Sequence, residues 1–328
     1  MRLISPRALA IAFATSAALA GSGLAQEFRS ADTHPLDYPT VQAVAYMGKL
    51  LAERSNNRMT IKIFPSNQLG EEKDTIEQTK IGAIALNRVN MAPFNNIVPE
   101  SSIPALPFVF RSTNHMRAVM DGPIGEDIFK AFEPHGFIGL AYYDSGARSF
   151  YNSKRPIRSP EDMKGLKIRV QQSDLFVALV QALGANPTPM PFGEVYTALK
   201  TGVIDGAENN WPSYESTRHF EVAKYYTINE HSLSPEVLVM SKIVWDKLAP
   251  ADRDVVKKAA KDSVPYMRTL WDAREKKSRD VVVAGGSQII EGIDKKPFQD
   301  AMKPVYDKFV TDAKMKDLVR RIQATPSS

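Results

Sequence analysis

The chain has 328 residues, 43% hydrophobic and 24% charged, and its 42 basic and 37 acidic residues give a formal net charge of +5. This is an ordinary globular composition, long enough for two domains. The absence of cysteine excludes disulfides, thiolate metal sites and a lipid-modified cysteine anchor, and the lack of a basic stripe interleaved with aromatics argues against nucleic acid as a partner.

Residues 1–25 have the pattern of a secretory signal peptide. Arg2 and Arg7 precede a short apolar run, and small residues follow before the expected cleavage point. The run is too short to span a bilayer, and no later segment is long enough. We therefore expect an exported protein that begins near Gln26 with 40 basic and 37 acidic residues, a net charge of +3. With no anchor, its compartment in a Gram-negative bacterium is the periplasm.

The first part of the chain alternates strands and helices. Strands are expected over 28–32, 59–64 and 84–89, with one helix over 41–51 and another ending near 82. This order predicts a parallel sheet with right-handed crossovers. Further on, we expect an irregular segment over 103–110, helices over 115–120 and 124–132, and strands over 136–143 and 147–151.

The turn at 144–146 is where we place the passage into a second domain. Beyond it we expect strands over 166–170 and 225–227 and helices over 175–183 and 192–202, while 186–191 contains three prolines. Residues 237–241 then return the chain to the first domain, and helices follow over 243–248, 250–284 and 297–322. The predicted division is 26–146 plus 237–275 for the first α/β lobe and 147–236 plus 276–328 for the second.

One strand carries the strongest indication of a binding site. Leu166, Ile168 and Val170 alternate with Lys167 and Arg169, which predicts a strand with one buried face and with Arg169 pointing away from it. The strand opens onto a helix start, the place where open α/β sheets bind ligands. A guanidinium there fits a carboxylate with two parallel hydrogen bonds. The alternative is a solvated strand residue or a surface ion-pair partner.

Other polar side chains stand at the ends of predicted strands, and in a parallel sheet such ends gather on one edge. We therefore expect them to converge on a cleft between two domains. They are His34, Arg88, Arg148 and Asn209. With Arg169 at the same edge, two arginines and an asparagine would make a carboxylate site.

Enzyme signatures are missing. The five histidines show no pair at metal-ligand spacing, and there is no His-Glu-x-x-His helix. The chain also lacks a Gly-x-Ser-x-Gly elbow, a phosphate loop and a dinucleotide fingerprint. We expect a protein that is not an enzyme, with a secreted hydrolase of unusual motif as the remaining alternative.

Two long motifs carry a family resemblance: residues 162–170 (DMKGLKIRV) and 191–209 (PFGEVYTALKTGVIDGAEN), with 67–70 (NQLG) in agreement. The chain resembles the solute-binding proteins of tripartite ATP-independent periplasmic (TRAP) transporters, the DctP family, over essentially its whole mature length. The resemblance implies a bilobed α/β fold with a ligand cleft between the lobes and a long helix near 250–284 bracing both. It also implies membrane permease subunits as partners, a monomer, and no ATP, metal or redox cofactor.

The resemblance also assigns residues. Arg169 matches the arginine that fixes the solute carboxylate, Arg148 resembles a second arginine near it, and Asn209 matches an amide that meets the same group. Contacts from the first lobe are implied for His34, Glu72 and Arg88. Without the resemblance, these three also fit a turn-orienting histidine, a charge at a helix N-terminus and a surface ion pair.

The remaining candidates concern the solute. Hydroxyl partners are abundant: His34, Glu72, Asn209, Asn210 and Glu236. Trp211 or Phe192 would cover an apolar ring face unless they are core residues. This pattern favours a polyhydroxylated monocarboxylate and is similar to the sugar-acid branch of the family, so we expect D-glucuronate or D-galacturonate. An aldonate, sialic acid or a C4-dicarboxylate remains open, because an arginine clamp does not separate them.

Overall fold

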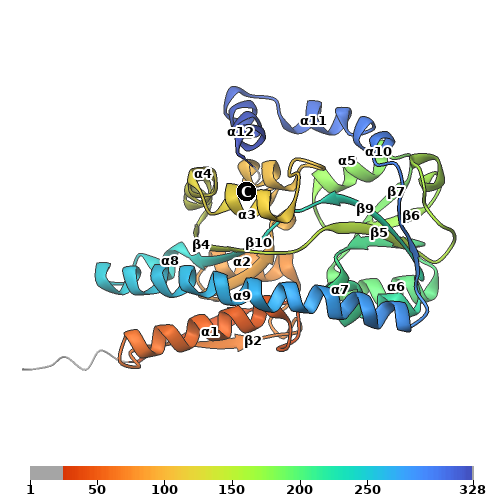
Figure 1. Cartoon of the computed structure of the whole chain (residues 1–328). Helices are drawn as coiled ribbons and strands as arrows, with labels where there is room; N and C mark the ends of the chain where they lie inside the picture. Colours follow the sequence, from red (N-terminus) through yellow and green to blue (C-terminus); the bar gives the residue numbers. More distant parts are fainter. Residues whose placement is uncertain (1–24, 327–328) are drawn as a thin grey trace, which may run out of the picture.

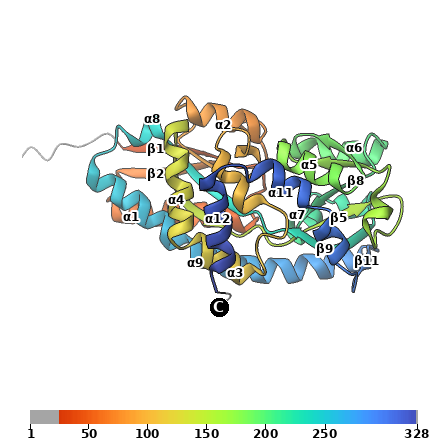
Figure 2. The same cartoon turned by 90° about the horizontal axis from the view of Figure 1, so that it is seen from above.

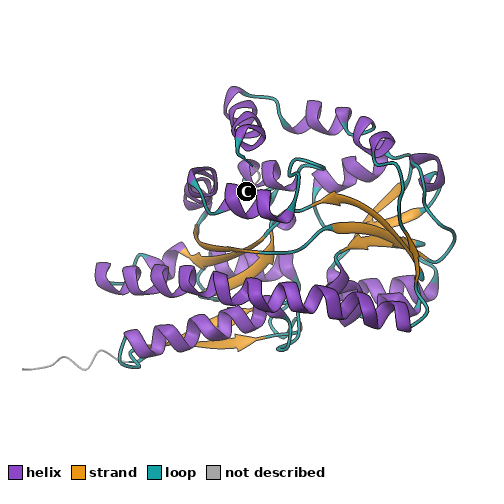
Figure 3. Cartoon of the chain, in the orientation of Figure 1, coloured by secondary structure: helices purple, strands orange, loops and turns teal. Residues whose placement is uncertain are grey.

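The computed structural model describes residues 25–326 as two lobes, each built on one β-sheet, with one long helix running along both (Figures 1 and 3). The predicted α/β bilobed fold is confirmed. The expected signal peptide lies, except for its last residue, outside the described residues. Among the helices that are described, none combines the length and apolar character needed to cross a membrane.

The first sheet has the strand order β2-β1-β3-β10-β4. Its strands are β1 (Gln26–Ala31), β2 (Met59–Phe64), β3 (Leu86–Asn90), β4 (Phe137–Tyr143) and β10 (Glu236–Ser241). The helices α1 (Pro39–Arg54) and α2 (Glu72–Lys80) connect the first three strands. Since β1 is parallel to both β2 and β3, the predicted parallel order is confirmed there, whereas β10 enters antiparallel between β3 and β4.

The second sheet has the order β11-β9-β5-β8-β6-β7. Its strands are β5 (Arg148–Asn152), β6 (Lys167–Val170), β7 (Asn186–Pro189), β8 (Gly206–Asn209), β9 (Tyr225–Ser232) and β11 (Gln288–Ile290). The first part of the proline-rich segment 186–191, to which we assigned no element, is β7. It lies at the sheet edge, where a missing backbone N–H is tolerated.

Shorter helices cover the two sheets. On the first-lobe side they are α3 (Thr113–Met120), α4 (Pro123–Phe132) and α8 (Lys242–Trp245), with 3-10 turns at Ala92–Phe94, Pro99–Ala105 and Glu133–His135. On the second-lobe side they are α5 (Asp174–Ala182), α6 (Val195–Thr201) and α7 (Trp211–Ser216), with 3-10 turns at Pro160–Met163, Phe192–Glu194 and His219–Glu221.

The prediction of one C-terminal helix over 297–322 is wrong. This part of the chain forms three helices, α10 (Lys296–Asp300), α11 (Lys303–Phe309) and α12 (Ala313–Ala324). The side chain of Asp312 accepts a hydrogen bond from the backbone N–H of Met315, so a new helix starts there. In Figure 2, α12 lies over the first lobe beside α4, and α11 extends from it across the junction toward α5. α11 packs on α5, whereas α12 packs on α4, so the last helix contacts the first lobe although we assigned 276–328 to the second.

The predicted long helix is α9 (Pro250–Ala284), 35 residues or about 52 Å at 1.5 Å per residue. Proline at its first position fits a helix start. It packs against α1 and β4 in the first lobe and against α7 in the second, which makes it the brace that the family resemblance implied. The chain also passes between the sheets at 144–146, from β4 to β5, and at 233–235, from β9 to β10.

Candidate functional site

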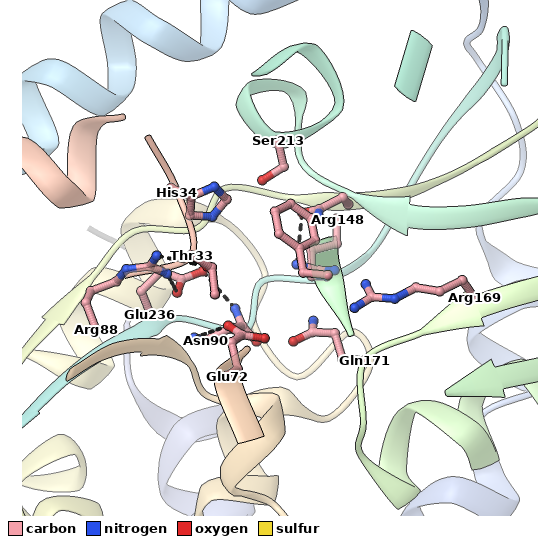
Figure 4. A pocket seen from close by; sticks show the side chains of 12 residues that line it. Thr33, His34, Glu72, Arg88, Asn90, Arg148, Arg169, Gln171, Ser213 and Glu236 are labelled. Carbon is pink, nitrogen blue, oxygen red and sulfur yellow. Dashed lines mark hydrogen bonds and ion pairs between the residues drawn. The ribbon is translucent and has the colours of Figure 1, made fainter. Parts of the chain in front are cut away.

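A small polar cavity lies where the two lobes meet (Figure 4). It is lined from the first lobe by Thr33, His34, Glu72, Arg88, Asn90 and Glu236, and from the second by Arg148, Arg169, Gln171, Phe192, Asn209 and Ser213. Eight of the ten residues singled out in the sequence therefore face one cavity. Three of its wall residues are arginines, and their different partners define the site.

Arg169 is the arginine without an acidic partner. Its Nε and Nη2 both donate to the carbonyl oxygen of Met190, at 2.9 and 2.7 Å. The side chain is buried, lies 5.8 Å from the centre of the Phe192 ring, and forms no ion pair with any described residue. Burial lowers its pKa. An unpaired buried charge is costly, so this position is poised to receive an anion.

Arg148, on β5, is neutralised from within the protein. Its Nε donates to Oε2 of Glu208 at 2.6 Å and its Nη2 to Oε1 at 2.8 Å. Burial alone would raise the pKa of Glu208, but Arg148 and His231 lower it to about 2. Nη1 of Arg148 donates to Oδ1 of Asn209 at 3.0 Å, and the backbone N–H of Asn210 donates to the same oxygen. Asn209 is thus oriented with its amide NH2 as the remaining donor.

Arg88, on β3, is held by two carboxylates. Its Nε donates to Oδ2 of Asp32 at 2.8 Å, its Nη2 also bonds Asp32, and its Nη1 donates to Oε2 of Glu236 at 2.6 Å. Glu236 further accepts hydrogen bonds from Asn90 and Ser145. Arg88 lines the cavity, but its charge is balanced, and it organises the first-lobe wall instead of offering a free cation.

Glu72 is the first residue of α2 and faces this wall. Burial raises its pKa to about 7, and Glu236 adds to the increase, whereas Arg88 and Arg169 oppose it. Among the described residues, its carboxyl group accepts one hydrogen bond, a long one of 3.4 Å from the backbone N–H of Asn90 to Oε1. At neutral pH the protonated and ionised forms of the Glu72 carboxyl group are therefore both populated, so the group can donate as well as accept a hydrogen bond.

His34 lies between aromatic rings. It stacks on Tyr38 with ring centroids 3.7 Å apart and meets the edge of Phe192 at 5.2 Å. Burial, followed by Arg88 and Arg148, holds its pKa well below 6.5, so the imidazole is neutral. Its Nδ1 is buried and has no hydrogen-bond partner among the described residues. It remains available to a ligand.

Two predicted contacts lie outside the cavity wall. Asn210 caps α7: its Oδ1 accepts from the backbone N–H of Ser213 at 2.7 Å, and its Nδ2 donates to the carbonyl of Ser145 at 2.7 Å. Trp211 stacks on Tyr226 at 3.9 Å and lines a separate depression on the second lobe. They are the next two residues after Asn209, and the turn into α7 places them away from the site.

Sequence reasoning missed four wall residues: Thr33, Asn90, Gln171 and Ser213. Asn90 ends β3 and Gln171 follows β6 at once. Scoring every polar residue at a strand end, charged or not, would have found both. Ser213 lies in α7, and its part in the wall depends on the path of that helix, which no local pattern reveals.

Comparison with known proteins places this arrangement in a family. The model described as "Bacterial extracellular solute-binding protein, family 7" (DctP) matches residues 30–312. A solute-binding protein of Chromohalobacter salexigens is 41% identical over 313 residues, which cover 95% of this chain and 93% of the relative.

Solved structures resemble the whole fold. A TRAP periplasmic solute-binding protein of Bradyrhizobium sp. BTAi1, in complex with α/β-D-galacturonate, is 64% identical with a TM-score of 0.90, over 92% of this chain and 100% of that one. A counterpart from Pseudomonas putida F1 with bound D-glucuronate is 43% identical with a TM-score of 0.89, over 92% and 98%.

Proposed function

Because this chain belongs to family 7 of the bacterial extracellular solute-binding proteins, the DctP family, we propose that it is the receptor of a TRAP transporter and binds a hexuronate, D-galacturonate or D-glucuronate. The proteins that resemble it at 64% and 43% identity hold these two sugar acids. Members of the family bind solutes and are not enzymes, so the solute should leave this protein unchanged.

The observation that carries the proposal is the isolated charge of Arg169. Among the described residues its guanidinium hydrogen-bonds to a carbonyl oxygen and forms no ion pair, whereas Arg88 and Arg148 are each paired with a carboxylate of the protein. The carboxylate of a sugar acid would supply the missing counter-charge through charge-assisted hydrogen bonds. A neutral sugar would leave the buried guanidinium unpaired, so the same residue provides affinity and rejection.

The rest of the solute would meet neutral or balanced polar groups. The amide of Asn209 lies beside Arg148 and would donate a hydrogen bond to the solute carboxylate. His34 and Glu72, on the first lobe, would hydrogen-bond to the ring hydroxyls of the solute. The ring of Phe192 offers an apolar surface next to Arg169. Since these groups come from both lobes, binding would hold the lobes together, with bending at 144–146 and 233–235.

The partners follow from the family. TRAP receptors work with membrane permease subunits, and we propose that the solute-bound form of this chain docks on such subunits as a monomer in the periplasm. Among the described residues, no group of three or more His, Asp and Glu side chains is placed to hold a metal ion.

The direct test is calorimetric titration with D-galacturonate and D-glucuronate, beside D-gluconate, sialic acid, succinate and D-galactose. We expect saturable binding of at least one hexuronate, weaker binding of the other acids, and none of galactose. Equal binding of galactose and galacturonate would overturn the role of Arg169. Tighter binding of sialic acid or succinate would move the assignment to another acid. NMR of the released solute checks that it is chemically unchanged, because conversion would indicate a hydrolase.

A further inference from the structure

Gln171 is a wall residue whose side-chain amide forms no hydrogen bond with any described residue. It is 4% exposed, and neither its Oε1 nor its Nε2 has a hydrogen-bond partner among the described residues. Buried amide groups are nearly always bonded, and those that are not need an explanation.

The surroundings of Gln171 show where its partners would come from. The residue lies two positions beyond Arg169, at the end of β6. Figure 4 shows its amide in the cavity beside the guanidinium of Arg169, facing Glu72 and Asn90 across the gap between the lobes. None of these groups bonds to it. The amide therefore points into the space that a solute fixed at Arg169 would fill.

The chemistry of the amide selects among solutes. It presents one acceptor and an NH2 donor side by side, which two neighbouring hydroxyl groups satisfy together: one donates to Oε1 and the other accepts from Nε2. A second carboxylate, as in a dicarboxylate, only accepts, so it would leave Oε1 unpaired. An unsubstituted ring would leave both atoms unpaired.

We propose that Gln171 is a specificity-determining residue that binds a pair of adjacent ring hydroxyls on the solute anchored at Arg169. This rests on the proposed function, since it assumes an acid bound at that arginine. Arg169 then recognises the charge that all organic acids share, and Gln171 recognises the hydroxyls that make the solute a sugar acid.

The test compares Gln171→Met, which keeps the length and removes both polar atoms, with Gln172→Met, the same change at a neighbour outside the cavity wall. The probes are D-galacturonate, D-glucuronate and tetrahydropyran-2-carboxylate, a cyclic acid without hydroxyls. With two hydrogen bonds removed, we expect Gln171→Met to bind the hexuronate about tenfold more weakly or worse. Affinity for the hydroxyl-free acid should be unchanged or higher, and Gln172→Met should behave as the unmodified protein.

The outcomes separate this inference from the proposed function. If the unmodified protein binds neither hexuronate, the proposed function fails. If it does bind one and Gln171→Met binds it equally well, only the role of Gln171 is overturned. An equal loss for the hexuronate and the hydroxyl-free acid would overturn it too, because Gln171 would then act by positioning Arg169. Unfolding temperatures at or above that of the unmodified protein would show that the variant is folded.

Discussion

Glu208 binds the guanidinium of Arg148 at two points, from Nε to Oε2 at 2.6 Å and from Nη2 to Oε1 at 2.8 Å. Arg169 lines the same cavity without any such partner. The two arginines therefore differ in function: one carries its counter-ion within the fold, and the other depends on the solute for it. Substitutions at these positions should separate stability from binding.

Replacing Arg169 by alanine should abolish or strongly weaken solute binding. Loss of one partner of a buried, hydrogen-bonded charge pair costs about 2 kcal/mol or more, roughly 30-fold in affinity. Calorimetry with the preferred hexuronate measures the loss, and Arg158→Ala, at an exposed arginine outside the cavity, is the matched control. Undiminished affinity in Arg169→Ala would contradict the assignment. The unliganded variant should be no less resistant to urea, since a buried unpaired charge has been removed.

Replacing Glu208 by glutamine should act on stability first. The change leaves Arg148 buried without its carboxylate, and breaking a buried ion pair in this way costs about 3 kcal/mol or more of the free energy of unfolding. Urea unfolding at pH 7 measures the difference. A variant as stable as the unmodified protein would show that the pair contributes little.

The same pair predicts an acid limb in the stability profile. Arg148 and His231 overcome the effect of burial and lower the pKa of Glu208 from 4.5 to about 2. The folded state therefore binds this proton less readily than the unfolded chain, so its stabilisation is full above pH 4.5 and is lost as pH falls toward 2. Unfolding midpoints measured between pH 6 and 3 should fall more steeply for the unmodified protein than for Glu208→Gln.

Glu72 predicts the opposite dependence near neutrality. Burial, with a contribution from Glu236, raises its pKa from 4.5 to about 7. The folded state holds this proton more tightly than the unfolded chain, so its contribution to stability is fully present below pH 4.5 and is lost as pH rises through 7. Urea midpoints between pH 5 and 8 should decline less in Glu72→Gln than in the unmodified protein.

Glu275, on α9, provides the companion measurement. Burial and the neighbouring Asp272 and Asp144 raise its pKa to about 7 as well. Glu275→Gln should remove a second part of the decline, and the double variant with Glu72→Gln should be flatter than either single one. If the slope persists in the double variant, other groups control the neutral range.

Substitution of Gly193 should affect the closure of the two lobes more than the folding of either. The backbone N–H of Gly193 donates to Oε2 of Glu71 at 3.3 Å across the gap between the lobes, and Glu71 also accepts from Asn67. A Cβ on Gly193 would lie 2.3 Å from Oε1 of Glu71, so that carboxylate would have to move. With about one hydrogen bond lost, Gly193→Ala should bind the hexuronate about fivefold more weakly.

The control for Gly193 is Val203→Ala, at an exposed side chain of the same lobe. Calorimetry gives the affinity and thermal unfolding without solute gives the stability. We expect the first to change and the second to stay the same in Gly193→Ala. A drop in stability with unchanged affinity would instead place Gly193 in the structure of its own lobe.

Local sequence patterns predicted much of the fold, because the strands and helices depend mainly on residues that are neighbours in the chain. The alternation of apolar and charged residues predicted the strand that carries Arg169, and the long helix expected over 250–284 is α9 with those bounds. Ser173 stands directly before α5, the position of a helix cap, yet its hydroxyl donates to Oδ1 of Asn95 in the other lobe. Position along a helix is local information, whereas the partner of a hydroxyl is not.

The candidate site divides along the same line. Polar residues at strand ends were identifiable, and most of them do line the cavity. The sequence could not show which arginine lacks a carboxylate partner. Asp32 and Glu208 reach Arg88 and Arg148 from positions 56 and 60 residues away in the chain. Gln171 was missed for a related reason: a neutral amide has no charge pattern or motif, and its importance lies in contacts that it does not make.

The place of β10 in the first sheet has a consequence for the order in which the molecule is assembled. Leu238 pairs with Arg88, 150 positions earlier, and β10 fills the gap between β3 and β4. A growing chain cannot complete its first sheet until residue 241 has been made, and contacts this distant in sequence slow folding. Until then β3 and β4 present unpaired edges that invite association with other chains. A chain that stops before residue 236 should therefore aggregate instead of folding as a smaller domain, however well its first strands are formed.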